Sequence, residues 1–222
     1  RIPSVLLLGM AALSASAAPV PGREAARALA QAEAALEPSV EPALAGEFAL
    51  QAGKLEQAAA DYLRAAQAST DDAGLAERAT RIAMLANDDA RAAQGLALWQ
   101  QRAPRSLAMR SAAGALAMRQ GKVDQAEREL EALLRDPDPR GWKFALAALV
   151  GGGQDPATPA DVLDALVTAD AIPPQIEAWQ EFGRLALRME RPALARRMVD
   201  EVVRRFPDEP RVALLHASQL QQ

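Results

Sequence analysis

The sequence predicts an all-α fold, an α-solenoid of about five stacked helix pairs. Small residues recur at a step of 34, which indicates one repeated supersecondary unit. The first series is Gly46, Thr80, Gly114, Ala148 and, one residue late, Gly183. The second series, twelve residues downstream, is Ala58, Ala92, Ala126, Ala160 and Ala195. Helix-forming residues are abundant and apolar residues never alternate as in a strand, so we expect no sheet.

The period divides the chain into helix–turn–helix units. We expect units near 42–72, 73–105, 106–139, 140–172 and 173–208, then the start of a further unit at 209–222. The expected turns within the pairs lie at Gly53-Lys54, Asn87–Asp89, Gly121-Lys122 and Glu190–Pro192. A Gly or Ala at each crossing point lets two antiparallel helices approach closely.

The fourth unit departs from the pattern. A short apolar helix over 142–150 is interrupted by three glycines at 151–153, and a new helix opens near Thr158. We expect Thr158 as the N-cap and Pro159 as the first helical residue. Since Ala148 and Ala160 keep the 34-residue step, we interpret this region as a damaged repeat and not as a domain boundary.

The first 41 residues precede both series of small residues, which we together call the small-residue ladder. Residues 1–17 resemble a signal peptide: Arg1 precedes a short apolar run, and Ala15 and Ala17 fit cleavage before Ala18. The run is shorter than the roughly 20 residues needed to span a bilayer. We therefore expect an exported, periplasmic protein, with a linker and a capping helix in 18–41.

Composition argues against most catalytic chemistry. The chain has no Cys, and His216 is the only His, which leaves few metal or triad arrangements. The glycines at 151–153 lack the Lys and Ser or Thr of a phosphate loop, and Asp136 and Asp138 are better explained as a helix stop than as calcium ligands. The net charge is -4 without a basic stripe, so we expect no nucleic-acid partner, and we expect no catalytic, cofactor or metal site.

The spacing resembles the tetratricopeptide repeat (TPR). The unit has small residues in its first helix, a turn, an early Ala in its second helix and, in the units that end at Pro104 and Pro207, a closing Pro. The stretches that carry the resemblance best are Ala43–Ala68, Leu107–Leu134 and Trp179–Pro207. The resemblance implies a right-handed solenoid with a protein or peptide ligand.

A narrower resemblance concerns Ala76–Ala83 and Ala97–Pro104. These stretches look like exported TPR lipoproteins of Gram-negative bacteria, one group of which is similar to the adaptor that links a carboxyl-terminal processing protease to cell-wall hydrolases. This resemblance implies an envelope protease or cell-wall enzyme as partner. Those lipoproteins carry a lipid-modified Cys, and this chain has none.

The expected binding surface is the concave face, lined by the first helix of each pair. By helical phase, the side chains that point into it are Glu47, Gln51, Glu77, Arg81, Met84, Ser111, Met118, Arg119, Gln180, Arg184 and Arg188. Their mixture of Arg, Met and Gln suits a peptide or helical ligand. We expect the three tryptophans, Trp99, Trp142 and Trp179, to pack inside.

The sequence therefore favours an exported, non-enzymatic adaptor that binds a protein or peptide through this face. Two alternatives remain open. The chain could be a spacer or assembly platform of an envelope complex, or the substrate-recruiting part of a larger enzyme.

Overall fold

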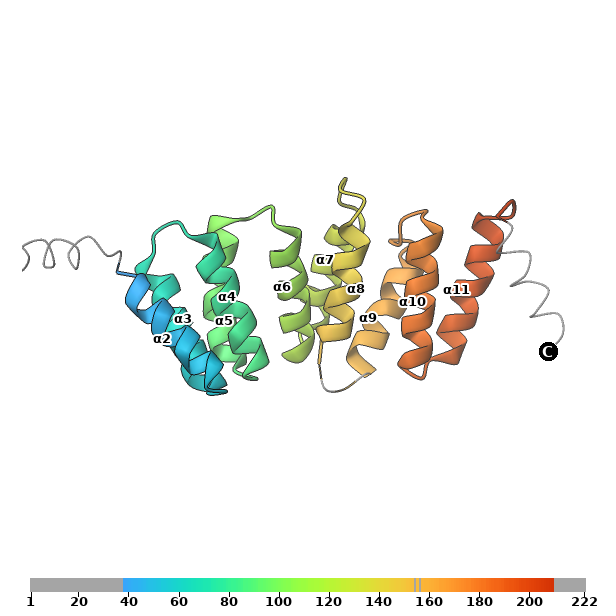
Figure 1. Cartoon of the computed structure of the whole chain (residues 1–222). Helices are drawn as coiled ribbons and strands as arrows, with labels where there is room; N and C mark the ends of the chain where they lie inside the picture. Colours follow the sequence, from blue (N-terminus) through green and yellow to red (C-terminus); the bar gives the residue numbers. More distant parts are fainter. Residues whose placement is uncertain (1–37, 154, 156, 210–222) are drawn as a thin grey trace, which may run out of the picture. The chain divides into compact units, whose positions relative to one another are not determined.

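A computed structural model describes residues 38–153, 155 and 157–209, and within these residues all regular structure is helical (Figure 1). The helices are α2 (Val40–Gln51), α3 (Leu55–Ala68), α4 (Ala73–Leu85), α5 (Asp89–Arg102), α6 (Leu107–Arg119), α7 (Val123–Leu134), α8 (Gly141–Gly151), α9 (Ala157–Thr168), α10 (Ile176–Arg188) and α11 (Pro192–Arg205). The all-α prediction is confirmed. The predicted signal peptide, capping helix and start of a sixth unit lie outside the described residues.

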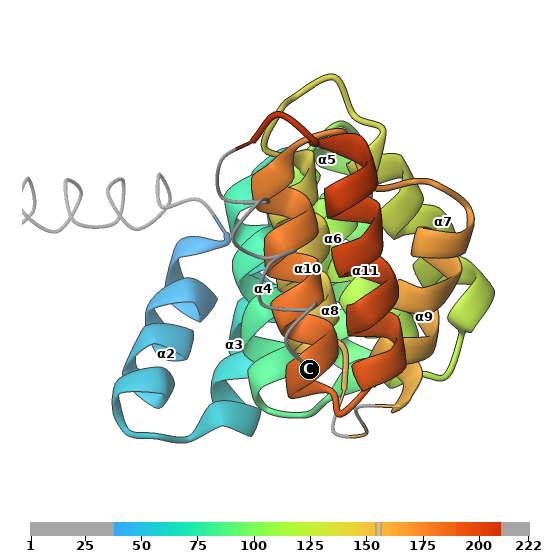
Figure 2. The same ribbon diagram turned by 90° about the vertical axis from the view of Figure 1, so that its right-hand side faces the viewer.

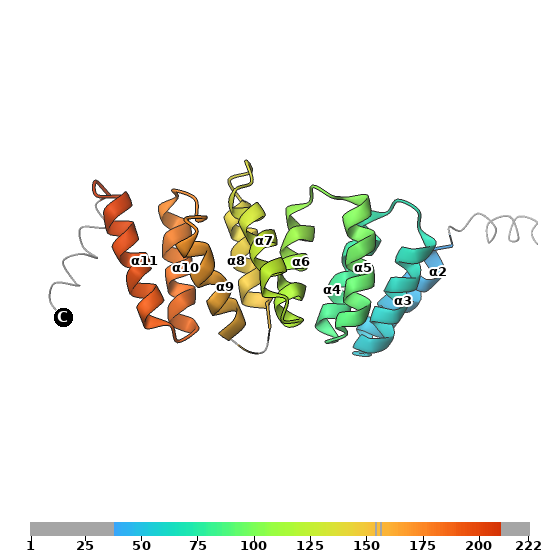
Figure 3. The same ribbon diagram turned by 180° about the vertical axis from the view of Figure 1, so that it is seen from behind.

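Consecutive helices pack against each other as hairpins. The hairpin pairs α2 with α3, α4 with α5, α6 with α7 and α10 with α11 make extensive contacts, and α3 packs as extensively on α4 of the next hairpin. We call α2, α4, α6, α8 and α10 the first helices and the others the second helices. All first helices run in the same direction, from the upper to the lower edge in Figure 1, and α4, α6, α8 and α10 contact one another in succession. The same order is seen from behind in Figure 3, and in Figure 2 the α10–α11 pair lies nearest the viewer.

The hairpin turns repeat the same backbone geometry. Each has one residue with positive φ just after the first helix: Gly53 (72°), Asn87 (56°), Gly121 (68°) and Glu190 (58°). The N–H of the next residue returns to a carbonyl of the helix, in the bonds Lys54–Ala49, Asp88–Ala83, Lys122–Ala117 and Arg191–Ala186, all of 2.9 Å. This pattern is the Schellman closure, and Gly is its least strained residue. The four turns predicted from the sequence are confirmed.

The small-residue ladder has a steric cause at some positions. A Cβ added at Gly46 would lie 2.9 Å from the Tyr62 ring, and one at Gly114 would lie 2.3 Å from Leu130 Cδ1. Thr80 occupies the same position in the second pair, where the small residue has moved to the opposite helix: a Cβ on Gly95 would lie 2.9 Å from the Thr80 backbone nitrogen.

Gly183 corrects the expectation that every ladder residue marks a close crossing. The nearest atom to a Cβ added there is Met198 Cβ at 3.9 Å, an ordinary van der Waals contact. The helices of the last pair therefore leave room for a methyl group at this position.

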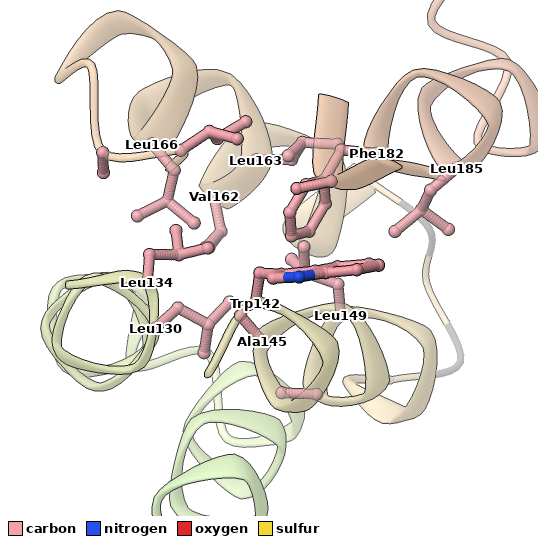
Figure 4. Close-up of a cluster of buried hydrophobic side chains, with 14 of the residues drawn as sticks. Leu130, Leu134, Trp142, Ala145, Leu149, Val162, Leu163, Leu166, Phe182 and Leu185 are labelled. Atoms are coloured by element: carbon pink, nitrogen blue, oxygen red, sulfur yellow. The ribbon is translucent and has the colours of Figure 1, made fainter. Parts of the chain in front are cut away.

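The tryptophans pack inside, as predicted. Trp99, Trp142 and Trp179 are all buried. Trp142 meets the Phe182 ring edge-on, with ring centroids 6.5 Å apart, and so joins α8 to α10 (Figure 4). Trp179 Nε1 donates a hydrogen bond of 3.1 Å to the carbonyl of Pro173, which satisfies the polar atom of its ring.

The fourth pair is the loosest, as the sequence indicates. α8 packs mainly on α6 and α7, and α9 packs mainly on α7, while α8 and α9 make few contacts with each other. The prediction of Thr158 as N-cap is wrong: α9 already begins at Ala157, whose N–H donates to Asp155 Oδ1 at 2.9 Å. Asp155 therefore supplies the side-chain acceptor that we had expected from Thr158.

The two glycines Gly114 and Gly183 offer a matched test of the steric explanation. Both are helical ladder positions, where Ala is favoured over Gly by about 1 kcal/mol. We expect Gly183→Ala to raise the free energy of unfolding by up to about 1 kcal/mol. We expect Gly114→Ala to lower it by up to about 2 kcal/mol, since Leu130 is fully buried and overpacking outweighs the helix gain. Urea unfolding measures both, and equal shifts for the two variants would refute the explanation.

Candidate partner-binding surface

All eleven residues expected on the binding face lie on first helices. Glu47 and Gln51 are on α2, Glu77, Arg81 and Met84 on α4, Ser111, Met118 and Arg119 on α6, and Gln180, Arg184 and Arg188 on α10. Their side chains divide into those already bound within the chain and those still exposed.

Glu47 belongs to a network between α2, α3 and α4. Its Oε2 accepts hydrogen bonds from Tyr62 Oη and Arg78 Nη2, both at 2.5 Å. The Arg78 guanidinium also lies 4.9 Å from the centre of the Tyr62 ring. The Tyr62 hydroxyl is the main cause that holds the pKa of Glu47 below its usual value, with smaller contributions from Gln51 and Arg78. Much of the hydrogen-bonding capacity of Glu47 is thus already used within the chain.

Arg119 links the end of α6 to the turn between α4 and α5. Its guanidinium forms an ion pair with Asp89 at 2.7 Å and donates to Asn87 Oδ1 at 3.2 Å and to the Met84 carbonyl at 3.3 Å. The side chain is only 17% exposed. Arg119 therefore joins two pairs and presents little surface to a partner.

The other α6 residues are also engaged. Ser111 Oγ donates a 2.8 Å hydrogen bond to the Phe144 carbonyl of α8. Met118 is buried, which corrects the expectation that it projects freely from the face. The reason is the close packing of α6 on α8: a Cβ added at Gly152 would lie 2.4 Å from Met118 Cε.

A hollow of about 440 Å³ lies beside Met118 and Arg119. Its other lining residues come from three connections between helices and from the first turns of α5 and α9, and are Asn87, Asp89, Gly121, Gly152, Gly153, Asp155 and Thr158. Glycines at 152 and 153 replace the Met and Arg that stand 34 residues earlier, at 118 and 119. The missing side chains leave this space open at the damaged repeat.

The remaining residues of the expected face keep polar surface. On α4, Glu77 pairs with Arg81 at 2.7 Å, and the Arg81 guanidinium lies 5.8 Å from the Trp99 ring centre. On α10, Gln180, Arg184 and Arg188 share one side of the helix because they are four residues apart. Arg184 pairs with Glu181 at 2.5 Å, and Arg188 is exposed, with no ion pair seen among the described residues. Gln51 is exposed and Met84 is half-buried.

Sequence reasoning missed the apolar part of the surface. Five large apolar side chains in the described part of the chain are more than half exposed: Leu44, Phe48, Leu85, Val150 and Leu187. All five belong to first helices. The last three stand in the final turn of α4, α8 and α10, close to the positions of Arg119 and Arg188 in the repeat. A search of the sequence for large apolar residues near these positions could have found them.

Acidic residues considered for other chemistry have local roles. Asp136 Oδ1 and Asp138 Oδ1 accept backbone N–H bonds from Asp138 and Arg140, both of 2.9 Å, in the turn after α7. Hydrogen bonds from Arg140 lower the pKa of Asp138 to about 2. The described residues contain no cluster of His, Asp or Glu suited to a metal ion. Within the same ranges, no helix has the length and apolarity required to cross a bilayer.

Comparison with known proteins adds no family: no protein-family model matches the chain, and no curated protein matches it significantly.

The Glu47 network predicts that the pKa of Glu47 depends on the Tyr62 hydroxyl. A carboxyl whose pKa is lowered in the folded state stabilises the fold at neutral pH, and this contribution is lost as the pH falls through the folded-state pKa. Tyr62→Phe keeps the ring and removes the hydroxyl, so we expect the pKa of Glu47 to rise toward its usual value. Carboxyl NMR titration of Glu47 in both proteins measures the change, and an unchanged pKa would contradict the assigned cause.

Arg119 and Arg188 stand at the same position of the repeat, but their substitution should affect the free energy of unfolding differently. Arg119→Ala removes several charge-assisted bonds from a mostly buried side chain, and we expect a loss of about 1–2 kcal/mol in the free energy of unfolding. Arg188→Ala alters an exposed position and should change it by less than about 0.5 kcal/mol. Urea unfolding compares the two; similar losses would argue against a joining role for Arg119.

Proposed function

We propose that this protein is a non-enzymatic adaptor that binds a protein or peptide through the exposed side of its first helices. In this proposal the helix pairs form a right-handed TPR-like α-solenoid, and the first helices line its concave face. The recurring turns and the succession of first-helix contacts support this arrangement. The resemblance to TPR proteins rests on the sequence pattern described above.

The observation that carries the proposal is the uneven distribution of exposed apolar side chains. Large apolar side chains cost free energy when they are exposed to water. Where several of them gather on one face of a protein, they often mark an interaction site. Leu85, Val150 and Leu187 lie on the first helices and in their final turns. Arg81, Arg184 and Arg188 lie on α4 and α10 near two of them and can supply specificity.

The proposals for the partner and its compartment rest on the sequence alone. The signal-like residues 1–17 support export, with cleavage before Ala18, and the narrower resemblance supports an envelope protease or cell-wall enzyme as partner. We expect no cofactor and no nucleic acid to be involved.

The apolar residues provide the test. We expect Leu85→Ser/Leu187→Ser to abolish or strongly reduce partner capture while helical content and the urea midpoint stay close to wild type, since both side chains are exposed. Crosslinking from an envelope extract, followed by affinity purification and mass spectrometry, compares the proteins captured by the two forms.

The reference for this comparison is Arg128→Glu/Arg196→Glu, which changes exposed residues on the second helices α7 and α11. Equal capture by all three proteins would refute the first-helix surface. Recovery of further copies of the chain alone would favour the assembly alternative.

A further inference from the structure

We propose that the partner segment is an acidic amphipathic α-helix that lies across the final turns of the first helices, with its apolar stripe on Val150 and Leu187. This inference rests on the proposed function and specifies the chemistry of the ligand. It depends on two independent features of the described residues, the contact between the helices that carry the exposed apolar side chains and the sign of the charges around them.

The spacing favours a helix over an extended strand. α8 and α10 contact each other, and packed helices have axes roughly 10 Å apart. Two turns of a partner helix rise about 10.8 Å, so residues seven apart reach both Val150 and Leu187 from the same side. In a strand, about 10 Å corresponds to a step of three residues, and the side chains at i and i+3 point to opposite faces.

Leu85, on α4, also lies within reach of such a partner helix. α4 is two first helices away from α8, with α6 in contact with both. A partner helix that continues in this direction reaches Leu85 after roughly four further turns, again on the same stripe. At α6, where Met118 is buried, the partner would cross without an apolar anchor.

The charge pattern favours acidic flanks. From their midpoints to their ends, over residues 79–85, 113–119, 146–151 and 182–188, the first helices α4, α6, α8 and α10 carry four arginines and no acid. The arginines are Arg81, Arg119, Arg184 and Arg188. Arg119 is held by Asp89, whereas Arg81 and Arg184 form pairs with exposed acids of their own helices.

Exposed pairs of this kind contribute little, so a carboxylate of the partner can replace the acid within the chain at small cost. Arg188 is exposed, with no ion pair among the described residues, and lies next to Leu187. An acidic residue of the partner beside its contact with Leu187 or Leu85 therefore finds an arginine on the same helix, as electrostatic complementarity requires, whereas the second half of α8 carries no arginine.

Three designed peptides of about 21 residues, long enough to form a helix, test this inference. The first carries Leu in an i, i+3, i+7 stripe with Glu on the flanks, the second has Lys in place of every Glu, and the third has the composition of the first with the Leu stripe scrambled. Fluorescence anisotropy measures their binding to the full chain. We expect the acidic peptide to bind at least tenfold more tightly than either of the others, with an affinity that falls as salt rises.

Variants of the protein identify the arginines. Arg184→Glu/Arg188→Glu should lower the affinity for the acidic peptide at least tenfold and raise the affinity for the Lys peptide. Arg128→Glu/Arg196→Glu, on the second helices, should leave both affinities within twofold of wild type. Equal binding of the acidic and Lys peptides, or full binding by Arg184→Glu/Arg188→Glu, would overturn the inference. Failure of the acidic peptide alongside capture that still depends on Leu85 and Leu187 would reject the acidic helix and leave the proposed binding surface standing.

Discussion

The close approach of two helices within the first three hairpins is the constraint on which the other features depend. It requires a small residue where the helices cross and a turn that reverses the chain within a few residues. Gly46 against Tyr62 and Gly114 against Leu130 meet the first requirement. A residue of positive φ with a backbone closure at the end of α2, α4, α6 and α10 meets the second. Because the turn recurs in four of the five pairs with the period of the sequence, these pairs present their first helices in the same direction.

This recurrence explains what could be predicted from the sequence. Helices and turns depend on local residues, so the 34-residue step located the turns at Gly53 and Gly121 and the break after α8. The burial of Trp99 and Trp179 followed from their size and helical phase. The N-cap of α9 was misplaced because Asp155 and Thr158 can both act as caps, and the packing of the damaged repeat decides between them.

The binding surface was harder to predict because helical phase gives direction and not distance. Met118 points toward the expected face, yet α8 approaches α6 closely enough to bury it. Arg119 and Arg188 occupy the same position of the repeat, but only Arg119 has Asp89 and Asn87 within reach in the preceding turn. At Gly183 the sequence predicts a close helix crossing, yet no atom of the facing helix lies close enough to require a small residue. Contacts between units depend on side chains about 30 residues away, and a repeat pattern alone does not specify them.

The engagement of α6 also shapes the surface that is left for a partner. Ser111, Met118 and Arg119 are all used to hold α6 against its neighbours, so this helix offers little to a ligand. Apart from Leu44 and Phe48 of α2, the exposed large apolar side chains and the exposed arginines of the expected face are thereby divided between α4 on one side and α8 with α10 on the other. Only the second group combines two neighbouring first helices, two exposed apolar residues and two arginines. A ligand that contacts both helices at once gains more than the sum of separate contacts, because the ordering of the ligand is paid only once. The α8–α10 region should therefore provide most of the binding energy, and α4 should add length and direction.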